Sequence, residues 1–532
     1  MAITIHNNIV SGPEELDIPA HLSYAQFLFD QLKKGGDKVA LVSTICGETG
    51  KFVTYREILQ QSVNLAVALQ KLGLKKGEVV ALCSENRFEF PVTALLQLKI
   101  KFISISGEIS HILKITKPKI IFTSPITAQN IQDCSEGSSV EKIVLFGDYD
   151  VIPGLMFNDL LKEKASVDDF ELADVGGMDT LAVMCSSGTT GLPKGVELTH
   201  INFLTLLHCK LNKNLPTHHL NFLALIPWFH AYGFITTFAV MSNHLEIVFL
   251  TRFEETLFLE TIQNYKVNMM TLVPPLAVFL AKHPLVLKYN LKSVNEVWCG
   301  AAPLSAEIQN AVSQRLGINF IRQGYGLTEV TMACCVDLSS KRRLGSCGTP
   351  APGMKIKVID IETGKKKGVR EEGELWIKSP LRMKGYMGDA ASSAALLDAE
   401  GYVRTGDIGF YDDEGAFYIV DRLKELIKYK GFQVAPAELE ALLLQHAGVA
   451  ECGVVGAPDE AAGELPTAFV VRQPQAGVTE RELVEYVAKK VSPAKHLRGG
   501  VIFIDDIPKN ASGKILRREL KVLLKKHKKS KL

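Results

Sequence analysis

The sequence predicts an α/β protein with a large N-terminal domain of parallel and mixed sheets covered by helices, a β-rich subdomain, and a small α+β C-terminal domain. Three observations predict this class. The chain has 532 residues, which is too long for one small module and long enough to bury a large core. Short apolar segments alternate with amphipathic segments through most of it. This pattern changes near residue 345 and again near Asp421.

The apolar segments of the N-terminal part have the length and composition of buried strands. Strands are expected at residues 79–84, 119–124, 142–147 and 246–251, and helices at 24–34 and 259–265. Strands that alternate with helices are typical of parallel sheets covered by helices.

The domain boundaries follow from the changes in pattern. Residues 1–420 are expected to form the N-terminal domain, with the β-rich subdomain at about 345–420, where strand–turn–strand patterns dominate. Residues 421–532 are expected to form the C-terminal domain, which at about 110 residues has an ordinary domain size. Its helices are expected at 436–448, 479–491 and 516–529, and its strands at 450–458, 466–473 and 500–508.

Residues 222–241 form an apolar stretch in which only His230 is chargeable. Its length admits a membrane span. However, Pro227 and Gly233 would break a helix, and no Lys or Arg flank sets an orientation. A buried strand, a turn and a buried helix explain the stretch better, so no transmembrane span is expected.

The composition excludes two classes of function. The chain carries 60 Lys and Arg residues and 58 Asp and Glu residues, a net charge of +2. This near-equality of positive and negative charges argues against a dedicated nucleic-acid binder and against a polybasic membrane protein. Ten scattered cysteines without a CxxC pair indicate buried thiols in a reducing compartment rather than a disulfide scaffold.

The chain stops at Ser530-Lys531-Leu532. A terminal S-K-L tripeptide is a peroxisomal address that an import receptor reads. The alternative is a solvated basic tail, since several lysines precede the tripeptide. The match at the terminus favours the address, so a peroxisomal location and an import receptor as partner are expected.

A segment rich in Ser, Thr and Gly, CSSGTTGLPKG from Cys185 to Gly195, follows the apolar strand TLAVM. Small and hydroxyl-bearing residues let backbone N–H groups converge on an anion, and Lys194 adds a positive charge. The segment is not a Walker A loop, because the GxxxxGK[ST] spacing fails and Pro193 precedes the lysine. By composition alone, a phosphate-binding loop and a flexible turn are equally good interpretations.

The string SSGTTGLPKG resembles the phosphate-loop signature of the acyl-adenylate-forming superfamily, which includes acyl-CoA synthetases, 4-coumarate–CoA ligases and beetle luciferases. Further motifs similar to those of that superfamily follow in the same order. They are YGLTE (325–329), TGD (405–407), the hinge DRLK (421–424), the post-hinge loop KYKGFQV (428–434) and PKNASGK (508–514). The resemblance covers nearly the whole chain and is strongest to beetle luciferases and their non-luminous acyl-CoA ligase relatives.

The resemblance implies an ATP-dependent enzyme that joins a carboxylic acid to the α-phosphate of ATP, releases pyrophosphate, and passes the acyl group to CoA. It implies Lys514 as the adenylation lysine, Thr328 as a hydrogen-bond donor to the α-phosphate, and Glu329 as a ligand of Mg²⁺. Tyr325 would stack on adenine, and Asp407 would accept from the ribose hydroxyls. The full set of implied ATP- and AMP-binding residues is Ser186, Ser187, Gly188, Thr189, Thr190, Gly191, Lys194, Gln323, Gly324, Tyr325, Gly326, Thr328, Asp407 and Arg422.

The second step needs a thiol nucleophile. The resemblance implies that the C-terminal domain turns about the hinge at residues 421–424, so that one site serves two reactions. This motion would remove Lys514 and present Lys428, Gly431 and Phe432 to the acyl-adenylate and the pantetheine arm of CoA. Lys428 is therefore expected to act in the second step.

The acyl pocket is expected around two segments. WFHAYGF resembles the family's aromatic segment, which places Phe229 and His230 beside the substrate carboxylate, with His230 in a catalytic or gating role. Taken alone, a histidine in an apolar run is more often a core residue. CGAAP resembles the pocket-wall turn, in which Gly300, Ala301 and Ala302 leave room for substrate.

Two positions depart from beetle luciferases. They carry an arginine about six residues after the histidine that follows the phosphate loop, where this chain has Leu206. They also carry a serine three residues beyond the YGLTE glutamate, where this chain has Met332. Apolar residues at both positions favour a hydrocarbon tail, since each buried methylene contributes about 0.8 kcal/mol. We therefore expect a medium- or long-chain fatty acid as substrate.

Two other functions compete with an acyl-CoA ligase. One is a luciferase that oxidises luciferyl-adenylate with O₂, because that chemistry needs no further cofactor motif. The other is a binding protein without catalysis. The chain is shortened near residues 104–110, where the family has a stretch similar to NPxYTxxEL, and a defect there would favour the second alternative.

Overall fold

A computed structural model gives the fold of the chain. It describes residues 3–13, 18, 23–44, 49–95, 101–104, 108–147, 151–186, 192–208, 220–319, 321–337, 341, 343–510 and 513–530. The phosphate-loop residues Ser187, Gly188, Thr189, Thr190 and Gly191 lie outside these ranges, as do residues 105–107 and the terminal Lys531 and Leu532.

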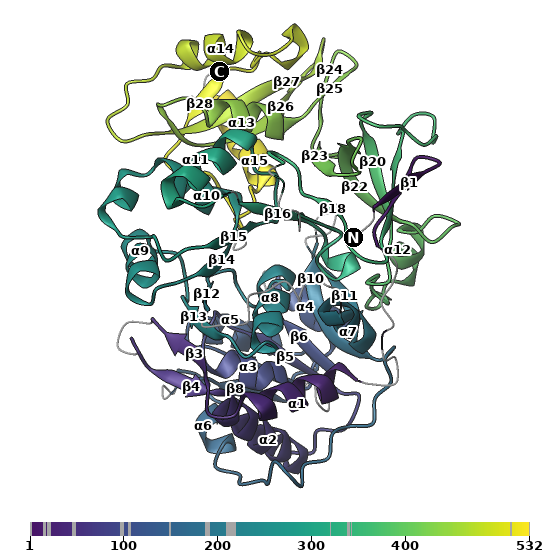
Figure 1. Cartoon of the computed structure of the whole chain (residues 1–532), viewed down its shortest axis with the longest axis vertical. Coiled ribbons are helices and arrows are strands. Elements are labelled where there is room, and N and C mark those ends of the chain that lie inside the picture. Colours follow the sequence, from purple (N-terminus) through teal and green to yellow (C-terminus); the bar gives the residue numbers. More distant parts are fainter. Residues whose placement is uncertain are drawn as a thin grey trace.

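An eight-stranded sheet forms the lower part of the molecule in Figure 1. Its strands are, in spatial order, β21 (Gly385–Tyr386), β11 (Lys194–Thr199), β10 (Thr180–Ser186), β6 (Lys101–Ser104), β5 (Val79–Cys83), β7 (Ile120–Thr123), β8 (Lys142–Leu145) and β9 (Leu155–Met156). Neighbours from β10 to β9 are parallel, whereas β11 pairs antiparallel with both β10 and β21. The strands predicted at 79–84, 119–124 and 142–147 are confirmed as β5, β7 and β8.

A second sheet of nine strands follows. Its order is β18 (Thr349–Pro350), β17 (Cys335–Val336), β16 (Arg322–Tyr325), β15 (Glu296–Cys299), β14 (Met269–Leu272), β12 (Asn221–Ala224), β13 (Glu246–Phe249), β3 (Val39–Ser43) and β4 (Phe52–Thr54). The strands from β16 to β3 are parallel, and antiparallel strands complete both edges. The strand predicted at 246–251 is confirmed as β13.

Helices cover these two sheets. They are α1 (Tyr24–Gly35), α2 (Tyr55–Lys71), α3 (Glu89–Ala94), α4 (Ile109–Thr116), α5 (Ala128–Ser135), α6 (Phe157–Leu160), α7 (His200–His208), α8 (Ala231–Met241), α9 (Glu255–Asn264), α10 (Pro274–Lys282) and α11 (Ala306–Leu316). Local sequence explains their ends. Helix α2, for example, begins at a capping box in which the Thr54 side chain accepts from the Glu57 backbone and Glu57 accepts from the Thr54 backbone.

The β-rich part is a six-stranded antiparallel sheet at the right of Figure 1. It consists of β1 (Thr4–His6), β2 (Ile9–Ser11), β19 (Lys355–Ile359), β20 (Gly373–Lys378), β22 (Val403–Tyr411) and β23 (Phe417–Arg422), with the short helix α12 (Ala390–Ala395) between β20 and β22 in the chain. The N-terminal hairpin joins this sheet because Val10 pairs with Ile356. No pattern within residues 1–11 predicts a partner so distant in sequence.

The C-terminal unit, from β24 to α15, lies at the top of Figure 1 above α10 and α11. Its sheet has the order β25 (Phe432–Val434), β24 (Ile427–Tyr429), β27 (Gly463–Arg472) and β26 (Val449–Asp459), and β28 (Val501–Phe503) pairs with β27. Its helices are α13 (Pro436–Leu443), α14 (Glu480–Ala488) and α15 (Arg517–Ser530). It has its own apolar core, and the predicted α/β fold class is confirmed.

The domain boundary at Asp421 remains a prediction. The pairing of β22 with β23 continues to Arg422, so the β-rich sheet ends inside the predicted hinge. The Asp421 carboxylate accepts from the Arg422 backbone (2.7 Å) and from the Ala437 backbone in α13 (2.8 Å), which ties both sides of the boundary together.

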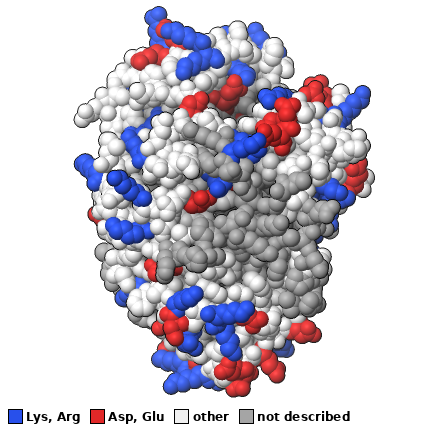
Figure 2. All heavy atoms as spheres, viewed as in Figure 1, with Lys and Arg blue, Asp and Glu red and all other residues white. Residues whose placement is uncertain are grey.

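Two further expectations are confirmed. Residues 222–241 contain strand β12, a turn and helix α8, and no helix within the described ranges is long and apolar enough to cross a membrane. The eight cysteines in those ranges are free thiols, and six of them are buried. Figure 2 shows Lys and Arg side chains interspersed with Asp and Glu side chains on one face of the molecule.

Candidate active site

Three predicted nucleotide-binding residues meet where β16, β22 and β23 end. The β22–β23 register places Asp407 opposite Arg422, and the Arg422 Nε lies 3.1 Å from Asp407 Oδ1. The Tyr325 hydroxyl donates to Asp407 Oδ2 at 2.7 Å. Burial raises the pKa of Tyr325 well above its usual value, so the hydroxyl remains a donor. Asp407 is 5% exposed, and these two partners hold its carboxylate in one orientation.

A turn of the C-terminal unit brings Lys514 close to the cluster of Tyr325, Asp407 and Arg422. The Lys514 backbone donates to the Asn510 side chain at 2.9 Å. Gly513 has φ +77°, and a Cβ there would lie 2.9 Å from the Val273 side chain. The glycine thus lets the turn press against the N-terminal part.

The Lys514 ammonium is surrounded by groups of both signs. Burial lowers its pKa to about 8, and the Arg422 cation acts in the same direction, while Asp407 and Glu425 act against it. The structure therefore brings the predicted adenylation lysine together with Asp407 and Arg422. A cation within electrostatic range of a buried carboxylate suits a site that receives a nucleotide and an acid.

His230 lies within the electrostatic range of Lys514. It caps helix α8, where its Nδ1 accepts from the Tyr232 backbone at 3.3 Å. Burial lowers its pKa to about 4, with a smaller contribution from the Lys514 charge. His230 is thus neutral at pH 7 and can hydrogen-bond a carboxylate without carrying a charge.

Thr328 and Glu329 open a short 3₁₀ helix (Thr328–Val330) directly after β16. The Tyr386 hydroxyl donates to Glu329 Oε1 at 2.9 Å. The Tyr386 ring also lies under Lys194, whose Nζ is 4.6 Å from the ring centroid and 3.5 Å from Asp389 Oδ2. One tyrosine therefore orients both the predicted metal ligand and the lysine of the phosphate loop.

Sequence reasoning missed Tyr386. It stands on the two-residue strand β21, which pairs with β11 opposite Val196. Only this pairing brings it to Lys194. The Gly-Tyr pair at residues 385–386 carries no charge or metal-ligand spacing that marks it as functional.

The phosphate loop connects the antiparallel strands β10 and β11, where Ser186 pairs with Lys194. The Ser186 hydroxyl is buried and has no hydrogen-bond partner among the described residues. A buried hydroxyl without a partner is unfavourable unless a ligand accepts from it. This observation fits the predicted phosphate contact of Ser186.

The YGLTE turn depends on Gly326, and the Gln323 amide just before it supports a neighbouring turn. A Cβ at Gly326 would lie 1.2 Å from the Met332 carbonyl oxygen, so no other residue fits there, whereas a Cβ at Gly324 meets only ordinary contact distances. The buried Gln323 side chain accepts from the Leu304 backbone at 3.1 Å and donates to the Leu304 carbonyl at 3.3 Å. Gln323 thus supports the turn that follows β15.

Apart from His230, the predicted pocket residues differ in burial: four are buried or partly buried, and two are exposed. Leu206, Phe229 and Met332 pack on one apolar cluster of the core. Gly300 is buried, and a Cβ there would lie 3.5 Å from the Tyr232 ring. The remaining members are small and exposed: Ala301, which has φ +72°, and Ala302.

The predicted CoA-binding residues lie elsewhere. Lys428 stands on β24, and Gly431 and Phe432 form the turn into β25. All three are exposed, and the Phe432 side chain is 61% exposed. The structure does not bring them to Lys514 and Asp407.

The donor set fits a magnesium ion that arrives with a nucleotide. The described residues contain no group of three or more His, Cys, Asp or Glu side chains able to hold a metal. Mg²⁺ commonly binds through one carboxylate together with substrate phosphates. Glu329, oriented by Tyr386, can provide that carboxylate.

Family models match both parts of the chain. A model described as an AMP-binding enzyme matches residues 28–387, and one described as an AMP-binding enzyme C-terminal domain matches residues 438–514. The chain belongs to the AMP-binding enzyme family. The second match ends at Lys514.

Curated relatives of this AMP-binding enzyme include luciferases and ligases. It is 41% identical to luciferin 4-monooxygenase of Photuris pensylvanica over 98% of this chain and 99% of that protein. It is 37% identical to 4-coumarate–CoA ligase 3 of Arabidopsis thaliana over 96% of this chain and 93% of that protein.

Solved structures of similar fold include an anthranilate CoA ligase in complex with anthranoyl-AMP, with a TM-score of 0.87 and 24% identity over 96% and 98% of the two chains. They also include o-succinylbenzoate CoA synthetase from Bacillus subtilis in complex with its acyl-adenylate, with a TM-score of 0.77 and 26% identity over 93% and 97%. The AMP-binding enzyme thus falls within the adenylate-forming acyl-CoA ligase superfamily, as the motifs implied.

Proposed function

We propose that this AMP-binding enzyme joins a medium- or long-chain fatty acid to CoA through an acyl-AMP intermediate. The observation that carries the proposal is the meeting of Lys514 with Asp407, Arg422 and His230 across the boundary between the two parts of the chain. A cation that the C-terminal unit brings to a nucleotide site suits adenylation, in which negative charge spreads over the α-phosphate.

In the first step, a carboxylate oxygen of the acid attacks the α-phosphorus of ATP. The bond from that phosphorus to the bridging oxygen breaks, and pyrophosphate leaves with its electron pair. Lys514 stabilises the charge that develops, and Asp407 accepts from the ribose while Tyr325 and Arg422 hold it. Glu329 would hold Mg²⁺, which would neutralise phosphate charge when bound.

In the second step, the CoA sulfur loses its proton and attacks the acyl carbon, and AMP leaves with the electron pair of the broken bond. The exposed Lys428, Gly431 and Phe432 would face the acyl-adenylate after the C-terminal unit turns about residues 421–424. Their exposure supports this part of the proposal, because an exposed aromatic side chain next to a lysine is available for the adenine and phosphates of CoA.

Apolar packing supports an aliphatic acid. Leu206 and Met332 replace polar residues of the luciferase pattern. Leu206 is buried in the large N-terminal core cluster, and Phe229 and Met332 are partly buried against that cluster. An alkyl chain gains about 0.8 kcal/mol per methylene buried against such a surface. Affinity is therefore expected to rise with chain length until the available apolar surface is covered.

A panel of saturated fatty acids from C6 to C18, together with 4-coumarate and benzoate, tests the proposal. Pyrophosphate release is measured with and without CoA, and the thioester is identified by mass. We expect kcat/KM to rise about tenfold per added pair of methylenes within the preferred range. Failure of every acid to give a thioester would contradict the proposal.

A luciferase is the second candidate, because several luciferin 4-monooxygenases are 38–41% identical to this chain. Photon emission with luciferin, ATP and O₂ tests it. Strong emission together with poor fatty-acid turnover would reverse the order of the two candidates. Weak emission with efficient thioester formation would support the ligase.

We also propose a peroxisomal location, supported by the terminal S-K-L tripeptide. A fluorescent protein carrying the last twelve residues should enter peroxisomes, whereas the same fusion without Leu532 should stay outside them. An even distribution of both fusions would contradict this location.

A further inference from the structure

Lys282, the last residue of α10, reaches from the N-terminal part into the C-terminal unit. Its Nζ donates to the Val449 carbonyl at 3.0 Å and to the His446 carbonyl at 3.4 Å. In Figure 1, α10 lies directly below the C-terminal unit. Lys282 is half-buried, and burial lowers its pKa. Its ammonium therefore gives up part of its hydration for these two carbonyls.

The two carbonyls belong to a rigid turn between α13 and β26. The Val449 backbone donates to the His446 carbonyl at 3.1 Å, and the Gly448 backbone donates to the His446 ring at 3.1 Å. The turn follows the C-terminal end of α13, where unpaired carbonyls favour a nearby cation. The turn thus offers a preformed acceptor for an ammonium group.

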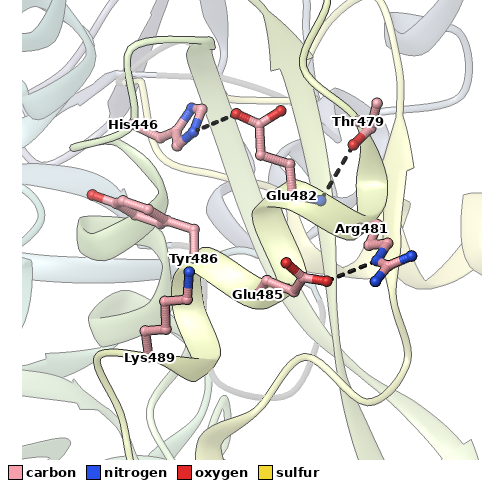
Figure 3. Close-up of a pocket in the computed structure, with 7 residues that line it drawn as sticks. All are labelled: His446, Thr479, Arg481, Glu482, Glu485, Tyr486 and Lys489. Carbon is pink, nitrogen blue, oxygen red and sulfur yellow. Dashed lines mark hydrogen bonds and ion pairs between the residues drawn. The ribbon is translucent and has the colours of Figure 1, made fainter.

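The His446 side chain lines a surface pocket of about 400 Å³ in the C-terminal unit, and its neighbours there hold the ring in place (Figure 3). The His446 Nε2 lies 3.3 Å from Glu482 Oε1. The ring also packs edge-to-face on Tyr486, with 4.9 Å between centroids. Because α14 holds the His446 ring, the His446 carbonyl moves together with the C-terminal unit. Any movement of that unit away from α10 therefore breaks the hydrogen bond with Lys282.

Helix α10 touches the C-terminal unit at both ends. Val273, which caps its first turn, meets Gly513 beside the Lys514 turn, and Lys282 ends its last turn. The Arg315 guanidinium of α11 donates to the Leu280 and His283 carbonyls and so fixes the C-terminal end of α10. Helix α10 therefore joins the Lys282 contact at one end to the Val273–Gly513 contact beside Lys514 at the other.

We propose that Lys282 is a positioning residue that holds the C-terminal unit in the arrangement that places Lys514 at the nucleotide site. This inference rests on the proposed two-step function. The Lys282 contacts and the seating of Lys514 occur together in this arrangement. On this proposal they favour the adenylation step and break before the thiol step.

The two half-reactions measured separately on the full chain test this role. Acid-dependent exchange of pyrophosphate into ATP reports adenylation, and thioester formation from synthetic acyl-AMP and CoA reports the second step. For Lys282→Met we expect exchange to fall about tenfold, because hydrogen bonds from a charged donor are lost. Thioester formation should be unchanged or faster. Lys282→Arg should restore exchange, and Lys282→Gln should give an intermediate rate.

Lys288→Met is the matched control, because Lys288 is an exposed lysine close by in the chain. It should leave both half-reactions at the wild-type rate. An equal fall of both half-reactions in Lys282→Met, or unchanged exchange in all three Lys282 variants, would overturn the role of Lys282. Absence of acid-dependent exchange in the wild-type chain would instead contradict the proposed function.

Discussion

Two loops of the C-terminal unit differ sharply in their surroundings. The turn that carries Lys514 is pressed against Val273, and its ammonium lies among Arg422, Asp407 and Glu425. The turn that carries Phe432 is exposed to solvent. The two turns belong to one small unit, so one arrangement can present only one of them to the nucleotide site. This difference supports the proposed roles of Lys514 in adenylation and of the Phe432 loop in thioester formation.

The strongest test of this comparison is removal of the buried cation. Lys514→Met should lower acid-dependent pyrophosphate exchange about 100- to 1,000-fold, the range found for loss of one preorganised group at developing charge. Thioester formation from synthetic acyl-AMP should change little, because the proposed turn of the C-terminal unit removes Lys514 from the site. The exposed Lys525→Met serves as control and should keep both rates. Equal losses in the two assays would contradict the division of labour.

The protonation state of Lys514 gives the next largest effect. Burial lowers its pKa to about 8, and only the protonated form is cationic. The kcat/KM for adenylation should therefore be level below pH 8 and fall about tenfold per pH unit above it. Lys514→Arg should abolish this fall, since a guanidinium stays charged. A profile that the arginine variant leaves unchanged would assign the titration to another group.

The exposed loop is expected to show the opposite selectivity. Phe432→Ala should lower thioester formation about tenfold through a higher KM for CoA, while pyrophosphate exchange stays at the wild-type rate. Phe52→Ala is a suitable control, because Phe52 is 58% exposed on β4. A loss of exchange in Phe432→Ala would show that this loop also serves adenylation.

The smallest effect concerns the tyrosine that links the two charged groups of the site. Tyr386→Phe keeps the ring under Lys194 but removes the donor to Glu329. Pyrophosphate exchange should fall about fivefold, and the concentration of Mg²⁺ needed for half-maximal rate should rise. Tyr411→Phe removes another hydroxyl from the β-rich sheet and should leave the Mg²⁺ dependence unchanged. An unaltered Mg²⁺ dependence in Tyr386→Phe would remove the tyrosine from this role.

Much of the fold and of the site could be predicted from sequence because the signals are local. The apolar runs that became β5, β7, β8 and β13 each lie within a few residues, and the capping box of α2 spans only four. The loop motifs around Tyr325, Asp407 and Lys514 are also contiguous. The position of Tyr386 could not be predicted in this way, since it contacts Glu329 across 57 residues of chain through a two-residue strand.

The sequence by itself determined the fold class, the chemical groups of the nucleotide site and the apolar residues Leu206 and Met332, because these depend on residue type and short spacing. Only the tertiary structure decided which groups meet. It placed Lys514 beside Asp407, bound Lys282 to the turn at His446, and left Phe432 in solvent. The reason is that burial and hydrogen bonding between distant segments set the pKa of Lys514 and the seating of the C-terminal unit, and no local pattern encodes either.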